Sequence, residues 1–292
     1  MLRLTKVSRR NIKLIGMIQI KQLGEITQFK MGRESQGQAP WEPPGQVFYW
    51  TSAYLVDGLL IDTGCPHTAE EFVRSLEGRA IKFAVNTHYH EDHIGANYLL
   101  QQKLGLRIMA SRKSIPLINM VHKQQAYQEM IWGIPVPTKV ELLPHRIETE
   151  HFRFDVVPTP GHCKGHVALV EPTHGWCFSG DLYSSQEPKA IRPEEDMGET
   201  SRSIQKLVDL KTDELILFTS LGNVIQDGRE ALRACIAYLK DLSLKAKRLE
   251  KQGLSASTIR DQLFGRETIL AGITEGDVSA ENMVRAVLRA KI

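Results

Sequence analysis

Alternation of apolar and polar positions predicts β-strands over the first part of the chain. Residues 17–62 contain four runs rich in β-branched and aromatic residues, namely MIQIKQL, EITQFKM, VFYWTSAYLV and GLLID. Gly24, a polar stretch at 34–46 and the turn Asp57-Gly58 separate these runs. We therefore expect the compact part of the protein to begin near Met17 with strands that are joined by tight turns.

Strand and helix patterns alternate from there to residue 218. Helical spacing is found at 68–76, 95–104, 112–135 and 201–210. Strand patterns are found at 82–86, 106–110, 139–143, 146–157, 167–170, 176–179 and 214–218. Because the strands and helices fall into two successive blocks, the pattern predicts an α/β fold whose sheets carry helices on their outer faces.

The segment 229–292 has helical patterns and no strand pattern. Helices are expected around Leu232–Leu242, ending at Gly253, then at 257–264 and at 280–290, the last capped by Ser279. The apolar stripes of these helices are too narrow for a core of their own. We therefore expect 229–292 to pack on the domain that precedes it or to form a homodimer contact.

Residues 1–16 are basic and carry no secretory signal pattern. We interpret 1–16 as an N-terminal extension, 17–228 as the main domain and 229–292 as a C-terminal helical segment. Met17 is an expected alternative start of translation.

Composition and charge exclude several classes of function. A formal net charge of +3 is too small to indicate a nucleic-acid partner. No apolar run approaches the roughly 18 residues that a membrane span requires. The four cysteines are scattered without a C-x-x-C pair, which is typical of a protein in a reducing cytoplasm. We expect a cytoplasmic protein that acts on a small molecule.

The densest chemical signal is THYHEDH at residues 87–93, directly after a predicted apolar strand. Imidazole and carboxylate groups together suit Zn²⁺ and related transition metals, whereas Ca²⁺ or Mg²⁺ prefers oxygen ligands alone. In an extended loop, His88 and His90 project to the same side. Asp92 and His93 lie past the turn and face a neighbouring position. We predict that this loop binds a metal ion.

Two further clusters follow later strands. In TPGHCKGH at 159–166, a Pro-Gly turn holds His162 at the end of a strand. In FSGD at 178–181, Gly180 permits close backbone approach and Asp181 ends another strand. Each cluster by itself is weak evidence for a metal site. Because the two follow residues 87–93 in this order, they strengthen the prediction made from the first cluster.

This set of motifs resembles the metallo-β-lactamase superfamily, and its glyoxalase-II-like branch in particular. The resemblance rests on H-x-H-x-D-H at 88–93, T-P-G-H at 159–162, S-G-D at 179–181 and LIDTG at 60–64, and it covers about 17–228. It implies a four-layer αββα sandwich with the metals at one edge between the two sheets. It also implies that one metal ion is bound by His88, His90 and His162, and a second by Asp92 and His93, with Asp181 bridging. Asp62 and His166 would brace the ligands without binding a metal.

One position departs from the superfamily pattern. The superfamily usually supplies a last histidine to the second metal from a P-G-H-G turn after a late strand. The corresponding stretch here is LFTSLGN at 217–223, with Leu221 in that place. Leucine cannot coordinate a metal, so the second site is expected to bind its ion weakly, hold a different ion or stay empty. The expected metal is zinc, as one or two ions, and iron is the alternative.

Several side chains near the expected ligands are candidates for substrate contact. They are Lys164, Tyr183, Trp41 and Trp132. Cys163, beside a predicted ligand, is expected to be a small packed side chain.

A metal held by three histidines and an aspartate has room for a water molecule, whose pKa it lowers to roughly 7. Such a site supports hydrolysis of an ester, thioester, amide or phosphodiester, in which Asp92 orients or deprotonates the nucleophile. The resemblance to the glyoxalase-like branch favours a metal-dependent hydrolase of an ester, thioester or related acyl substrate. Two alternatives stay open. One is a mononuclear iron dioxygenase that resembles persulfide dioxygenases. The other is a ligand-binding or regulatory protein in which Leu221 marks the loss of catalysis.

Overall fold

The first of two β-sheets is built from the N-terminal half of the chain. A computed structural model describes residues 12–15, 17–34, 47–120 and 124–292. Eight strands form this sheet in chain order: β1 (Ile12–Ile15), β2 (Ile18–Leu23), β3 (Ile26–Glu34), β4 (Val47–Val56), β5 (Leu59–Ile61), β6 (Phe83–Val85), β7 (Arg107–Ala110) and β8 (Glu141–Leu142). Pairing is antiparallel from β1 to β5 and parallel from β5 to β8.

The second sheet comes from the following part of the chain. Its six strands are β9 (Arg146–Glu148), β10 (Arg153–Pro158), β11 (Val167–Glu171), β12 (Trp176–Gly180), β13 (Ile216–Thr219) and β14 (Val224–Ile225), in the order β14-β13-β12-β11-β10-β9. Neighbouring strands are antiparallel except β12 and β13, which are parallel and are connected through α6 (Met197–Val208).

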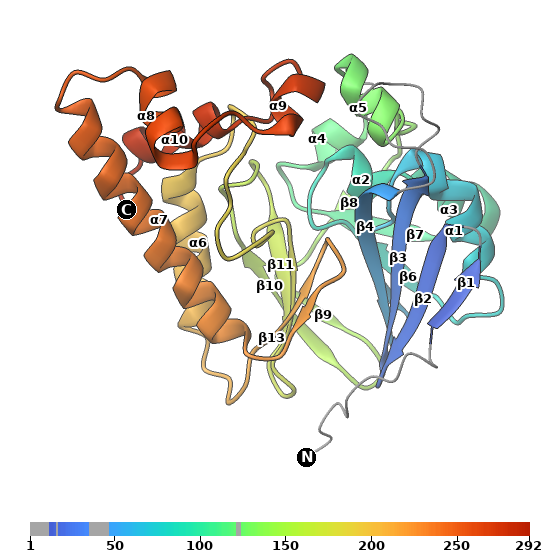
Figure 1. Ribbon diagram of the computed structural model, residues 1–292. Helices are drawn as coiled ribbons and strands as arrows, with labels where there is room; N and C mark the ends of the chain where they lie inside the picture. The colour runs from blue at the N-terminus through green and yellow to red at the C-terminus, as the bar shows by residue number, and fades with distance from the viewer. Residues whose placement is uncertain (1–11, 16, 35–46, 121–123) are drawn as a thin grey trace.

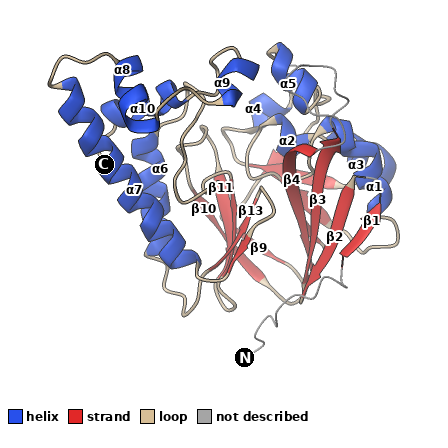
Figure 2. Cartoon of the chain, viewed as in Figure 1, coloured by secondary structure: helices blue, strands red, loops and turns tan. Residues whose placement is uncertain are grey.

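The two sheets face each other and carry helices on their outer sides (Figure 2). Between the sheets, an apolar cluster includes Ile26, Tyr54, Phe154, Phe178 and Phe218. A second cluster packs the first sheet against α1 (Ala69–Ser75) and α3 (Asn97–Leu104). A third packs the second sheet against α6 and the C-terminal helices. The predicted four-layer αββα sandwich is therefore confirmed.

The C-terminal helices are α7 (Gly228–Glu250), α8 (Ala256–Phe264), α9 (Ile269–Ile273) and α10 (Ala280–Arg289). The long helix α7 runs beside α6 along the outside of the second sheet (Figure 1). Leu232, Leu239 and Met283 are buried in the same cluster as Leu217 of β13. The hydroxyl oxygen of Ser279 accepts a hydrogen bond from the backbone N–H of Asn282 at 3.1 Å, as expected for a cap. None of the helices that the structure describes is both long and apolar enough to cross a bilayer.

Three local features differ from the sequence-based prediction. Residues 12–15, which we assigned to the extension, form β1 and pair with β2. The expected strand at 146–157 is two strands, because residues 149–152 form a turn in which the Thr149 N–H donates a hydrogen bond to the Phe152 carbonyl. The helical segment 112–135 contains two short helices, α4 (Ile115–Ile118) and α5 (Ala126–Ile131), and its residues 121–123 lie outside the described part.

The strand ends that carry the motifs meet at one edge of the sandwich. The loops after β5 and β6 leave the same edge because these strands are parallel. A hydrogen bond of 2.9 Å from the Val167 N–H to the Thr87 carbonyl joins the two sheets there. This edge brings residues 62, 87–93, 159–166 and 181 together.

Close packing of α2 (Glu91–Ile94) against the loop after β5 gives a test of the fold. A Cβ atom added at Gly95 would lie 2.2 Å from the carbonyl carbon of Cys65. Gly95→Ala should therefore lower the free energy of unfolding by about 3 kcal/mol, since backbone cannot move away as a flexible side chain can. Urea unfolding followed by tryptophan fluorescence measures this change.

Gly272→Ala is the matched control, because a Cβ at Gly272 in α9 meets nothing within 4 Å. It should leave stability unchanged or raise it by about 0.5 to 1 kcal/mol. Equal stability of the two variants would contradict the packing described for Gly95.

Candidate metal centre

The loop 86–93 is buried although nearly all of its side chains are polar. The carbonyl of His93 accepts hydrogen bonds from the Thr63 N–H at 2.9 Å and from the Asn86 side chain at 3.0 Å. The Asn97 amide donates to the Asn86 side-chain oxygen at 2.8 Å. These hydrogen bonds hold the loop in one conformation, and α2 begins directly after His90. The imidazole rings therefore have fixed directions.

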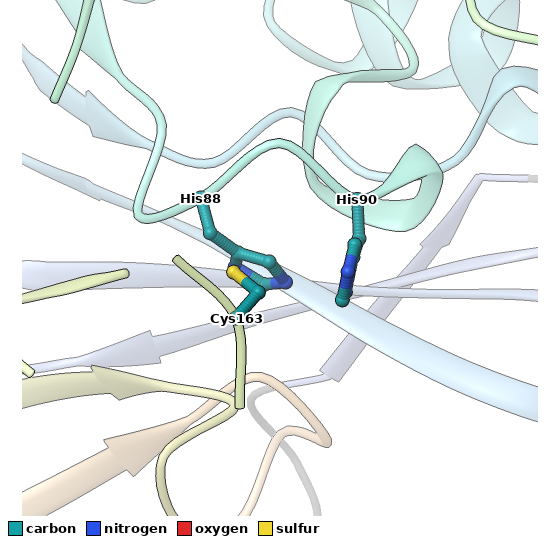
Figure 3. Close-up of side chains that lie close together, drawn as sticks. All are labelled: His88, His90 and Cys163. Carbon is teal, nitrogen blue, oxygen red and sulfur yellow. The ribbon is translucent and has the colours of Figure 1, made fainter. Parts of the chain in front are cut away.

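Histidines from both sheets meet at this edge. His162 Nε2 lies 2.8 Å from His90 Nδ1, and the ring centroids of His88 and His162 are 5.0 Å apart. Figure 3 shows His88 and His90 beside Cys163, which comes from the 159–166 turn. One ligand atom each from His88, His90 and Cys163 lie within 4.8 Å of one another. The three predicted histidines and one cysteine therefore share a single small space.

A second group of donors adjoins the first. His93 Nε2 lies 3.2 Å from Asp181 Oδ1 and 3.6 Å from Asp92 Oδ2. The other oxygen of Asp181 lies 3.4 Å from His162 Nε2. Asp181 thus contacts a histidine of each group, which is the position that the resemblance implies for a bridging carboxylate.

Asp62 lies behind these donors. Its carboxylate accepts hydrogen bonds from the Thr87 N–H at 2.7 Å and from the Thr87 hydroxyl at 2.8 Å, and Oδ2 lies 2.8 Å from His93 Nδ1. One carboxylate therefore fixes both the loop and the orientation of the His93 ring, which leaves Nε2 directed at Asp181.

His166 and Glu195 orient the residues from the second sheet. His166 Nε2 accepts a hydrogen bond of 3.1 Å from the Asp181 N–H, so this ring fixes the Asp181 backbone. Burial lowers the pKa of His166 to about 3 and keeps the ring neutral. Glu195 lies 3.0 Å from His162 Nδ1 and leaves Nε2 directed at the cluster. Gly180 allows the close approach of His166, because a Cβ there would lie 2.6 Å from His166 Nε2.

Burial and neighbouring charges shift the pKa values of the cluster residues. Burial lowers the pKa of His88 and of His90 well below the usual histidine value, so both are neutral donors. Burial would also lower the pKa of His93, but Asp92, Asp181 and Asp62 hold it well above the usual value. Burial raises the pKa of Asp92 to about 6. Burial opposes ionisation of Asp181 too, yet His93 and His162 hold its pKa well below the usual value.

The donors fit a metal ion. Buried His88 Nε2 makes no hydrogen bond within the described part of the chain, while His93 Nε2 and Asp181 Oδ1 face each other as an ion pair at 3.2 Å. Buried polar atoms without partners are costly in free energy. A cation coordinated by these atoms would remove that cost, and imidazole nitrogen with carboxylate oxygen is a donor set that transition metals prefer.

The residues expected to contact the substrate lie in different environments. Lys164 is exposed beside the cluster, and Trp41 lies outside the described residues. Tyr183 is instead buried in the apolar cluster under α6, α7 and α10, so it faces away from the metal edge. Trp132 is buried and packs edge-on against Tyr49, with ring centroids 5.2 Å apart. Its contact with the site runs through Tyr49.

Sequence reasoning missed Tyr49 and Glu195. The Tyr49 hydroxyl donates a hydrogen bond of 2.9 Å to Asp92 Oδ2. Both residues contact predicted ligands from more than 30 positions away in the chain, and neither stands in a motif. The adjacent acidic pair Glu194-Glu195 was the only signal in the sequence for one of them.

The loop that contains Leu221 adjoins the second group. A hydrogen bond from the Ser220 side chain helps to lower the pKa of Asp181. Leu221 is the next residue and is half-buried. Position 221 is therefore close in the chain to a contact with Asp181 but offers no donor.

Comparisons with known proteins identify relatives of the chain. The sequence profile of the metallo-beta-lactamase superfamily matches residues 51–219, which is more than half of the chain. Hydroxyacylglutathione hydrolase GloC of Haemophilus influenzae is 27% identical over 183 residues, which cover 59% of this chain and 82% of that protein. A probable metallo-hydrolase of Methanocaldococcus jannaschii is 26% identical over 131 residues, or 42% of this chain and 63% of that protein.

Solved structures share the fold at low sequence identity. A beta-lactamase domain protein from Burkholderia ambifaria superposes with a TM-score of 0.69 at 15% identity and covers 94% of this chain and 89% of its own. A metallo-beta-lactamase family protein from Thermus thermophilus gives 0.59 at 17% identity, with 89% and 91% covered.

An αββα sandwich with a histidine and aspartate cluster at one edge defines a class of metal-binding proteins. Within that class, the chain belongs to the metallo-beta-lactamase superfamily.

The contacts of Asp62 lead to a prediction about metal affinity. Asp62→Asn removes the charge beside His93 while keeping the size of the side chain. Zinc affinity, measured by competition with a chromogenic chelator, should fall about 10- to 100-fold. Asp155→Asn is the control, since Asp155 is an exposed carboxylate paired with Arg146 on β9. Unchanged affinity in Asp62→Asn would contradict the bracing contact.

A histidine at position 221 would add a metal ligand to the second group of donors. Leu221→His should raise the affinity for the second ion of a pair, because an imidazole adds one donor beside Asp181. Titration followed by elemental analysis should find more metal per chain in the variant than in the wild type at limiting zinc. Identical stoichiometry curves would show that position 221 does not reach the second group.

Proposed function

We propose that this protein is a metal-dependent hydrolase of a small ester, thioester or related acyl substrate. The observation that carries the proposal is the convergence of donors from both sheets on one edge, where His88 Nε2 makes no hydrogen bond among the described residues and His93 Nε2 lies 3.2 Å from Asp181 Oδ1. Relatives named hydroxyacylglutathione hydrolases support the thioester class.

The first ion would be held by His88, His90 and His162, and a second by Asp92 and His93, with Asp181 between the two. Zinc is the metal that we propose. When bound, such an ion supplies a hydroxide at neutral pH and polarises the substrate carbonyl. The contribution of the chain is to fix the donors, through Asp62 for His93, Glu195 for His162 and His166 for Asp181.

Asp92 is proposed to accept the proton of the nucleophile. Burial raises the pKa of Asp92 to about 6, so where no second ion is bound its carboxylate is available to accept a proton. The Tyr49 hydroxyl binds Oδ2 of Asp92 and so keeps this carboxylate in one orientation. Activity is therefore expected to fall as the pH drops below about 6, because protonated Asp92 no longer accepts a proton.

The proposal is tested with aryl esters and acyl thioesters in the presence of zinc, manganese or iron. Chelation should abolish hydrolysis and added metal should restore it. His162→Ala should lower kcat/KM by at least about 100-fold, because the ion loses one ligand. His145→Ala, at an exposed histidine outside the cluster, should retain full activity.

Two experimental outcomes would contradict the proposal. Hydrolysis that survives complete chelation would exclude a metal-dependent reaction. One iron per chain, with oxygen consumed on a persulfide substrate and no ester turnover, would favour the mononuclear dioxygenase that Leu221 makes plausible.

A further inference from the structure

A cavity of about 150 Å³ is lined by His90 and by described residues within 117–120, 124–128 and 134–136. His90 and Tyr89 line it from the loop 86–93, and Arg192 and Glu194 line it from the segment before α6. Because His90 belongs both to this cavity and to the metal cluster, whatever occupies the cavity lies next to the proposed reaction centre.

One wall of the cavity is apolar and partly open to solvent. Its apolar residues are Ile94, Leu117, Ile118, Met120, Ile134, Pro135 and Val136. Met120, Ile134 and Val136 are 59%, 49% and 48% exposed. Large apolar side chains that gather around a concave surface favour an apolar occupant, because contact with it removes their surface from water.

The polar lining residues of the cavity carry no surplus positive charge among those that the structure describes. Arg192 pairs with Glu91 at 3.0 Å, and both side chains are at least nine-tenths buried. Gln128 donates a second hydrogen bond to the same Glu91 oxygen at 3.1 Å. Glu194 adds a negative charge without a counterpart among these residues. Among the described lining residues, an anionic group would therefore meet repulsion from Glu194 and find no free cation.

We propose that this cavity binds an uncharged aliphatic or aromatic group of about six carbon atoms on the substrate of the proposed hydrolase. The size follows from the volume, since about 150 Å³ is the volume of a cavity that accommodates one benzene molecule. This inference rests on the proposed function.

The test is a series of p-nitrophenyl esters with acyl chains of two, four, six and ten carbons on the zinc-loaded protein. The value of kcat/KM should rise about tenfold from two to six carbons and then stop rising. An ester of the six-carbon length with a terminal carboxylate should react about tenfold more slowly than the uncharged ester. A flat series, or a preference for the charged ester, would overturn the proposal.

A pair of variants locates the effect. Val136→Asp places a charge on the apolar wall and should lower the ratio of kcat/KM for the six-carbon ester over the two-carbon ester about tenfold. Leu104→Asp makes the same change at an equally exposed position at the end of α3, outside the cavity, and should leave that ratio unchanged. Equal ratios in both variants would place the preference elsewhere.

Calorimetry with octan-2-one, a neutral ketone that cannot be hydrolysed, separates the two proposals. Binding to the wild type that is about tenfold weaker in Val136→Asp supports the cavity even if no ester is hydrolysed. Hydrolysis of all esters at one rate, without binding of the ketone, overturns the cavity assignment and leaves the proposed function standing.

Discussion

The desolvation of imidazole and carboxylate groups at the sheet edge is the constraint on which the rest of this structure depends. His88 and His93 are completely buried, and Asp62 and Asp92 nearly so. Groups of this kind lose strong hydration on folding and must be compensated by hydrogen bonds, by charge pairing or by a bound ion. Asp62, Thr87, Glu195 and His166 provide the hydrogen bonds. His88 Nε2 has no hydrogen-bond partner among the described residues, and a cation bound there would compensate it.

Much of the fold could be predicted because it depends on local periodicity. The strands rich in β-branched residues, the amphipathic helix α6 and the helical character of 229–292 follow directly from side-chain spacing. The order of sheets and layers did not come from periodicity, and it was the resemblance to a superfamily that supplied it. The segment 112–135 was harder, because its short helices are held by contacts with distant residues, such as that of His67 with the carbonyls of α5.

The candidate donors could be named from the sequence because they stand in compact motifs at strand ends. The residues that orient them could not, since Tyr49 and Glu195 reach the cluster only after the sheets have assembled. Tyr183 shows the opposite error. Proximity to Asp181 in the sequence favoured a role at the site, but the chain turns after β12 and buries Tyr183 on the other side of the sheet. Nearness in sequence is thus a poor guide to which face a loop side chain takes.

The hydrogen bond between Thr87 and Val167 joins two parts of the protein that otherwise have separate helical layers. Donors from both parts meet beside it, since residues 88–93 follow the first sheet and residues 162 and 181 belong to the second. An ion held there would tie the two parts into one cooperative unit. When the ion is bound, a substitution that disturbs the packing of either helical layer would then destabilise the whole protein. When the ion is lost, the same substitution would mainly destabilise its own part.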